Sequence, residues 1–498
     1  MSVSFNEIPD NVRTPLFFVE FDPSRAGGYV QNSRSLLIGQ MLAAGTADAE
    51  TPMLVSTPEQ AKEYFGQGSM LAAMMAAYRK VDDFAEVWCV GVEDAGAGVA
   101  ATKTVTFGGP ATAAGTVSLY VAGQRVRIAV AKDDTDAEIA TAAAAAVNAV
   151  ADLPVTAAAA AEVVTLTARH KGALGNGIDV RVNYLGAAGG EALPAGVTVA
   201  IAAGVNGTTD PDVSAAFAAL GDDEYDWIAC PYTDTANLDA VKAAMGADGG
   251  RWSWNRQIFG HVFSGFAGTV AALTTFGNAR NDQHVSVMGA KASPSPVWEW
   301  AAVYAARAGK FLAIDPARPV QTGVLNGLKA PAKADRFIQS ERNTLLYDGI
   351  STFTVDDDGT VRLERAITTY QQNAYGQADD AYLDVTTLAT LMEIIRRMRS
   401  AISSKYPRSK LADNGTAFGE GQAIVTPNII RAELVAQYRE METLGLVENT
   451  EAFKAALIVE RNADNQNRLD ILYGPDLVNQ LRVFAVNTQF RLNYPQAA

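Results

Sequence analysis

The chain has few of the residues that build redox and metal sites. Its 498 residues include two cysteines, Cys89 and Cys230, and three histidines, His170, His261 and His284. Each cysteine lies in an apolar, strand-like run, which favours buried free thiols over a disulfide framework and predicts folding in a reducing compartment. CxxC and HExxH spacings are absent, so the sequence predicts no zinc site and no other bound metal.

Motifs for catalysis and phosphate binding are also missing. The sequence holds no GxSxG and no Walker A pattern. The run Gly96–Ala101 is superficially similar to a dinucleotide fingerprint, but the strand-like TKTVTF follows it, and a pyrophosphate needs a helix N-terminus there. We interpret it as a linker. The three aspartates at 356–358 lack the spacing of a calcium loop and predict a hairpin turn. The chain is therefore predicted to use no cofactor and to be no enzyme.

Positive charge and long apolar runs are scarce. The chain has 40 Lys and Arg against 55 Asp and Glu, a net charge of −15, which argues against nucleic acid as a partner. The start MSVSFNEIPD lacks a signal peptide, and the apolar windows are broken by Gly, Pro and charge. We expect other proteins as partners, and no direct membrane insertion.

The patterns that are present predict an α/β core split by an insertion. Buried strand patterns alternate with helical ones from about residue 33 to 92 and again from 213, which is typical of a mostly parallel sheet. Between them the chain is rich in Ala, Gly, Thr and Val, with period-two runs and one helical run, DTDAEIATAAAAAVNAV. We therefore predict core parts at 26–97 and 209–334, and an inserted β-rich domain at 98–208 with few aromatic residues.

The region 335–480 predicts an α+β C-terminal domain. It contains long helical patterns and a hairpin that turns at Asp358-Gly359. Asp379, Asp380 and Asp384 are predicted to favour the N-terminus of the helix at 384–404. A basic cluster at the end of that helix has two interpretations, a solvated helix end or an electrostatic seam against an acidic neighbour. Its residues are Arg396, Arg397, Arg399, Lys405, Arg408 and Lys410.

An isolated strand pattern lies near each end of the chain, in the predicted arms 1–25 and 481–498. Neither has a local partner, so each either folds back onto its own subunit or adds to a sheet of a neighbouring subunit. Their apolar residues are Phe17, Val19 and Phe21 near the start, and Phe484, Val486, Phe490, Leu492 and Tyr494 near the end.

Four long segments resemble tail sheath proteins of Mu-type contractile bacteriophages. They are SVSFNEIPDNVRTPLFFVEFD, the run from Arg318 to Phe353, the run from Asp356 to Leu391, and KYPRSKLADNGTAFGEGQAIVTP. The resemblance as a whole covers both arms, the α/β core and the C-terminal domain. Members of the family resemble subtilisin in the architecture of their core, and here no catalytic triad can be assembled.

The resemblance implies a structural subunit of the virion that is assembled in the host cytoplasm. Such subunits form stacked hexameric rings around the tail tube and contract to drive the tube through the host cell envelope during genome delivery. The implied partners are other copies of the chain, the tail tube protein, and the baseplate and tail terminator proteins. In the family both arms pair with adjacent subunits by strand addition. The alternatives are the sheath of a phage-derived bacteriocin or injection device, and a surface carbohydrate-binding protein, against which the scarcity of Trp and Tyr in the insertion argues.

Overall fold

The computed structural model describes residues 33–492, and these residues divide into two compact units. The larger unit contains residues 33–389 together with 479–492, and the smaller unit contains residues 390–478.

An eight-stranded sheet forms the centre of the larger unit, in the order β15-β14-β13-β12-β11-β1-β3-β2. Six neighbouring strands run parallel, while β2 and β15 pair antiparallel at the two edges. The prediction of a mostly parallel α/β core is therefore confirmed. The strands are β1 (Arg34–Gln40), β2 (Met53–Leu54), β3 (Glu86–Val92), β11 (Trp227–Ala229), β12 (His261–Ala267), β13 (Val285–Ala290), β14 (Ile350–Val355) and β15 (Val361–Arg365).

Helices connect these strands and bury the sheet. α1 begins at a local sequence signal, because the Thr57 side chain accepts a hydrogen bond from the Gln60 N–H and Pro58 lies in the first helical turn. α7 packs against β11, β12 and β13, and it approaches closely because Gly309 faces the Trp227 ring, where a Cβ would lie 2.6 Å from a ring carbon. The helices are α1 (Pro58–Phe65), α2 (Met70–Arg79), α4 (Ser214–Ala219), α5 (Thr235–Met245), α6 (Val270–Asn278), α7 (Val297–Ile314) and α8 (Gln339–Tyr347).

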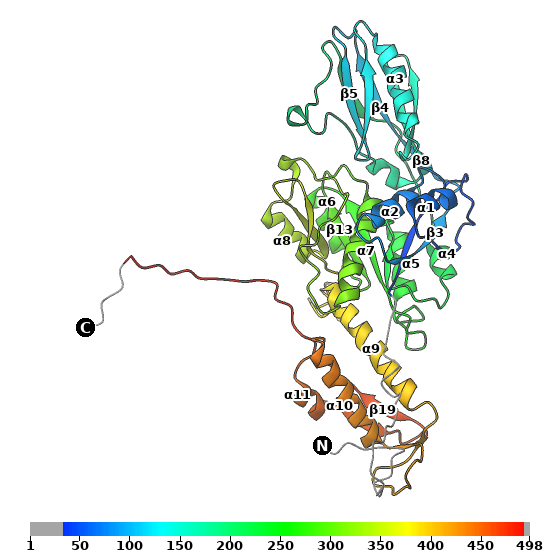
Figure 1. Ribbon diagram of the computed structural model, residues 1–498, viewed down its shortest axis with the longest axis vertical. Helices are drawn as coiled ribbons and strands as arrows, with labels where there is room; N and C mark the ends of the chain where they lie inside the picture. Colours follow the sequence, from blue (N-terminus) through cyan, green and yellow to red (C-terminus); the bar gives the residue numbers. More distant parts are fainter. Residues whose placement is uncertain (1–32, 493–498) are drawn as a thin grey trace, which may run out of the picture. The chain divides into compact units, whose positions relative to one another are not determined.

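The insertion forms two further sheets and one helix, α3 (Asp136–Ala149), which a Thr135–Glu138 capping box starts (Figure 1). The larger sheet has the order β10-β4-β8-β7 and the smaller one β6-β5-β9. Backbone hydrogen bonds between Val99 and Thr208 bring the two ends of the insertion together. The strands are β4 (Ala100–Gly108), β5 (Gly115–Val121), β6 (Gln124–Val130), β7 (Val155–Ala160), β8 (Val163–Lys171), β9 (Val180–Val182) and β10 (Thr198–Ala203).

The predicted hairpin at Asp358-Gly359 forms, with Gly359 at a φ of 88°, but it belongs to the core sheet. Its first strand, β14, pairs with β13, with Val287 opposite Ile350. The boundary predicted at residue 335 is therefore corrected for this segment, which extends the core. The local pattern of a hairpin says nothing about a parallel neighbour that lies sixty residues earlier in the chain.

The smaller unit contains helices and two short sheets. α9 (Val385–Lys405) begins in the larger unit and ends in the smaller one, and Tyr438 of α10 stacks on Phe453 of α11 with ring centroids 3.8 Å apart. The run FKAALIVERN begins in α11 and ends in β18. The other elements are β16 (Lys410–Leu411), β17 (Ile424–Val425), α10 (Pro427–Thr443), α11 (Thr450–Ala456), β18 (Ile458–Arg461) and β19 (Leu469–Leu472).

Candidate functional site

The C-terminal segment, residues 479–492, belongs to the larger unit but adds no strand to its sheets. Residues 479–492 contain no helix or strand, and no described strand pairs with them after Val478. The predicted apolar residues are almost uncovered, with Phe484 and Phe490 each 82% exposed and Leu492 92% exposed; Val486 is also exposed. Tyr494, like Phe17, Val19 and Phe21, lies outside the described residues. The described chain therefore leaves this apolar row without a partner.

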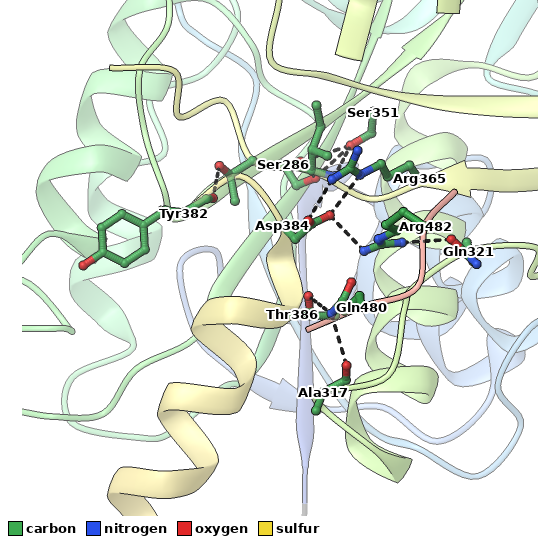
Figure 2. Close-up of polar contacts among 12 residues, drawn as sticks. Ser286, Ala317, Gln321, Ser351, Arg365, Tyr382, Asp384, Thr386, Gln480 and Arg482 are labelled. Carbon is green, nitrogen blue, oxygen red and sulfur yellow. Dashed lines mark hydrogen bonds and ion pairs between the residues drawn. The ribbon is translucent and has the colours of Figure 1, made fainter. Parts of the chain in front are cut away.

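The root of the segment, by contrast, is held firmly (Figure 2). Arg482 donates to Asp384 Oδ1 at 2.8 Å and to Gln321 Oε1 at 3.0 Å. Gln480 donates to the Ala317 carbonyl at 3.1 Å and to the Thr386 hydroxyl. Burial lowers the pKa of the Arg482 guanidinium, while Asp384 opposes this effect. We call Gln480, Arg482 and Asp384 the arm root.

Asp384 joins the arm root to the core sheet. Arg365, the last residue of β15, binds the same carboxylate through Nε at 3.1 Å and Nη2 at 2.8 Å (Figure 2). Two arginines thus share one largely buried acid, an arrangement that fixes orientation as well as adding energy. The sequence places Asp384 at the N-terminus of a helix, and Asp384 does directly precede α9. Its carboxylate has a further role that the sequence does not predict, because it also binds partners 19 and 98 residues away.

The other two acids of that prediction lie elsewhere. The Asp379 carboxylate accepts from the Tyr370 hydroxyl at 2.6 Å and from the Ala381 N–H at 3.1 Å. Asp380 is exposed. Neither contacts the arm root, so Asp384 alone of the three has that role.

We predict that Asp384→Ala destabilises the larger unit by about 2–3 kcal/mol, because Arg365 and Arg482 would be left partly buried without their carboxylate. Asp380→Ala is the matched control and should change stability by less than about 0.5 kcal/mol. Denaturant unfolding of both variants measures the difference. Equal stabilities would show that Asp384 has no special part in the arm root.

The predicted basic cluster is only partly available to a partner. Arg396 is 6% exposed, so it is removed from the predicted seam. Arg397 pairs with Glu393 and Lys405 with Glu433, and Lys410 donates to Gln422. Arg399 and Arg408 are exposed. An amphipathic pattern with several arginines does not show in advance which of them turns inward.

The edge of the core sheet where α/β proteins commonly bind ligands is filled by the insertion. The chain continues from β1 to β3 on one side of β1 and later adds β11 on its other side, and ligands bind outside the carboxyl ends of strands at such a switch point. Here Gln40, the last residue of β1, donates to Asp94 and to the Lys171 carbonyl, both at 2.7 Å. The β8 end of the insertion therefore occupies the crevice.

His170 completes this contact. The Met70 N–H donates to Nε2 at 3.0 Å, so the ring proton is on Nδ1, which contacts Asp94 at 3.0 Å. Burial raises the pKa of Asp94, but hydrogen bonds from His170, the Lys171 N–H and Gln40 outweigh it and hold the pKa below its usual value. No sequence motif indicates this contact.

The other two histidines are buried side by side at the start of β12 and β13. His261 is 2% and His284 4% exposed, and their ring nitrogens have no hydrogen-bond partner among residues 33–492. Burial lowers the pKa of His261 to about 3 and that of His284 to about 4. Within the described chain no group of three or more His, Cys, Asp or Glu side chains could hold a metal ion.

Both cysteines are buried free thiols, as predicted. Burial raises the pKa of the Cys230 thiol to about 12 and that of Cys89 further. No helix in the described part of the chain is long and apolar enough to cross a membrane.

A short hairpin in the smaller unit has unused sheet edges. β18 and β19 pair only with each other among residues 33–492. Ile458, Ile471 and Leu472 are exposed on it. A two-stranded hairpin is marginal by itself and offers both outer edges to further strands.

Comparisons with known proteins give one consistent result. Models of three phage tail sheath regions match the chain: a beta-sandwich domain at residues 96–220, the central domain at 206–369, and the C-terminal domain at 377–491. The chain is 43% identical over 494 residues to the Mu-like prophage FluMu tail sheath protein of Haemophilus influenzae, which covers 99% of this chain and 100% of that protein.

Two solved structures are similar at lower levels. A sheath tail protein of Listeria innocua has a TM-score of 0.48 and 12% identity, over 92% of this chain and 94% of that one. The helical sheath of the anti-feeding prophage in its contracted state has a TM-score of 0.48 and 11% identity, over 97% of this chain and 100% of that one.

Proposed function

Because the chain belongs to the phage tail sheath protein family, we propose that it polymerises into stacked hexameric rings around a tail tube and contracts to drive the tube through a host cell envelope. The unpaired C-terminal segment carries this proposal. Its apolar row is exposed in one chain, and a polymer would cover it.

Strand addition is the mode of contact that fits the segment. Each backbone hydrogen bond made with a neighbour contributes about 0.5–1.5 kcal/mol, and each covered Phe, Val or Leu about 1.5–3 kcal/mol. Phe484, Val486, Phe490 and Leu492 together therefore contribute about 6–12 kcal/mol, which is comparable with the roughly 4–15 kcal/mol that association costs, and the backbone hydrogen bonds add to it. The N-terminal arm, with Phe17, Val19 and Phe21, is proposed to act likewise.

The β18–β19 hairpin is the acceptor we propose for the added strand. It offers open edges and exposed apolar side chains in a different unit of the chain. A donor segment from another copy would convert a marginal hairpin into a sheet of three or more strands, which is the size at which small sheets become stable.

Engineered cysteines test this pairing, since Cys89 and Cys230 are buried and do not interfere. We expect Phe484→Cys with Ile471→Cys to give a ladder of covalent oligomers under oxidation when the protein is polymerised. Non-reducing gels measure the ladder, and Phe484→Cys with Val205→Cys, a position on the insertion, is the matched control. A ladder of equal yield in the control, or none in either, would rule out the hairpin as acceptor.

The arm root gives the proposed polymer a hinge of defined position. Gln480 and Arg482 are clamped to the core, whereas the chain from Val483 onward is exposed. The bodies of two subunits could then rotate while the added strand stays paired. A bistable packing of bodies would be the switch, with no chemical step.

The absence of catalysis is part of the proposal. The α/β core is proposed to resemble subtilisin in architecture only. The β8 end of the insertion occupies the crevice where such a sheet would bind a substrate. We further propose the tail tube, baseplate and tail terminator proteins as partners, and assembly in the host cytoplasm. The exposed members of the basic cluster are proposed to face one of these partners or a neighbouring copy.

A further inference from the structure

Two large aromatic side chains are almost fully exposed near the N-terminal ends of the parallel core strands. Phe84 is 95% exposed and Trp254 84% exposed. They lie in the loops that precede β3 and β12, which are parallel strands of one sheet, so both loops are at its N-terminal edge. Three strand spacings separate β3 from β12, or roughly 14 Å.

The loop of Phe84 is held rigidly. The Asp82 carboxylate accepts from the Phe84 N–H at 3.2 Å and from the Ala85 N–H at 3.3 Å. The Arg79 guanidinium donates to the carbonyls of Asp82 at 3.2 Å and Ala85 at 2.9 Å. The ring is thus presented on an ordered turn.

The loop of Trp254 is ordered in the same way. Gln257 donates from its side chain to the Trp254 carbonyl at 2.8 Å, and Arg256 pairs with Asp222 at 3.1 Å. The Arg251 guanidinium reaches the Asp223 carbonyl at 2.7 Å. These contacts link the loop to the one before β11.

This surface has the composition of an interaction site. Rigid exposed aromatic residues are typical binding anchors, because little conformational entropy is lost when they are covered. Two acids flank them: Asp83 and Asp223 are exposed, and neither has an ion-pair partner among the described residues. The partner that fits is a protein surface with apolar contacts and a basic rim.

We propose that Phe84 and Trp254 anchor a contact with a second copy of this chain, whose basic residues Arg408 and Lys410 meet Asp83 and Asp223. The chain carries a net charge of −15, so two copies repel unless a basic segment of one faces an acidic surface of the other. Arg408 and Lys410 are exposed, as such a contact requires. The inference rests on the proposed polymerisation, and it adds a second contact, independent of the terminal arms.

Hydroxyl-radical footprinting of the full-length chain tests the anchors. We expect Phe84 and Trp254 to be oxidised at least about 10-fold more slowly in the polymer than in the dilute unassembled protein, while Val205 on the insertion reacts equally in both. Equal reactivity of Phe84 and Trp254 in both forms overturns the proposal. If electron microscopy shows no polymer at any concentration, the proposed function fails, and this contact fails with it.

Paired variants test the occupant. Phe84→Ser with Trp254→Ser is expected to raise the critical concentration for assembly by at least about 10-fold, since anchor residues dominate binding; Val205→Ser is the control, and circular dichroism checks folding. Asp83→Lys with Asp223→Lys should raise the critical concentration similarly. Adding Arg408→Glu with Lys410→Glu to that variant should return the critical concentration to the wild-type value. Wild-type assembly by the serine variant overturns the anchors. If the variant with all four charges reversed assembles no better than the variant with only Asp83 and Asp223 reversed, the basic segment of the second copy is not the occupant.

Discussion

A chain that lacks residues 482–498 is expected to fold as a soluble protein and to lose polymerisation. The deleted residues cover little of their own unit, because the described part of the segment after Arg482 is exposed. Asp384 keeps Arg365, and Gln480 keeps its contacts with Ala317 and Thr386. The larger unit should therefore lose only the Arg482 contacts, at about 1–2 kcal/mol.

Assembly, by contrast, should fail completely. Loss of at least four covered apolar side chains, at about 1.5–3 kcal/mol each, removes about 6 kcal/mol or more from each contact. Since about 1.4 kcal/mol is tenfold in an equilibrium constant, the critical concentration should rise at least about 1,000-fold. Sedimentation velocity and electron microscopy measure the loss, and thermal unfolding measures the retained fold.

Point variants distinguish the contribution of the apolar side chains to assembly from that of the length of the segment. Phe484→Ser with Phe490→Ser should reproduce the effect of the deletion, because both side chains share one face of an extended strand. Asn487→Ser with Gln489→Ser changes the opposite face and should leave assembly intact. Normal tubes from the truncated chain would defeat strand addition by this segment, whatever the point variants do.

Acidification is expected to destabilise the larger unit through His261 and His284. Both side chains are neutral when folded, because burial lowers their pKa values to about 3 and about 4, whereas an unfolded histidine titrates near 6.5. The unfolded chain therefore binds more protons below pH 6.5, and stability falls as pH falls. Between pH 7.5 and 5 each histidine should remove about 2 kcal/mol, or about 4 kcal/mol together.

Denaturant unfolding at several pH values checks this result. His261→Leu and His284→Leu should each reduce the loss between pH 7.5 and 5 by about half, since each removes one titrating group. Comparison with the unmodified chain removes the contribution of carboxylate titration to the pH dependence of stability, because the carboxylates are common to all three proteins. A single variant with the same pH dependence as the unmodified chain would show that its imidazole is already solvated or charged in the fold.

Local patterns predicted the elements well where their cause is local. The cap of α1 follows from Thr57 and Pro58, and the turn at Gly359 follows from a glycine that tolerates positive φ. The unpaired state of residues 479–492 also follows from sequence, because a strand pattern without a neighbouring pattern has nothing local to pair with.

Contacts between distant residues could not be predicted. Asp384 looks like a helix-start residue, and its partner Arg482 lies 98 positions away in a segment that is otherwise unpaired. The pairing of β14 with β13 and the burial of Arg396 likewise depend on which surfaces meet after folding. One sequence states the periodicity of a segment, but it does not state which distant surface covers it.

The bridge between Val99 and Thr208 gives the molecule a natural place for grafting. Since the chain leaves and re-enters the core at adjacent points, any domain whose own ends lie close together could replace the native one without stretching the scaffold. A foreign antigen or enzyme placed there would be carried once per subunit, so a polymer of this chain would present it in a regular array.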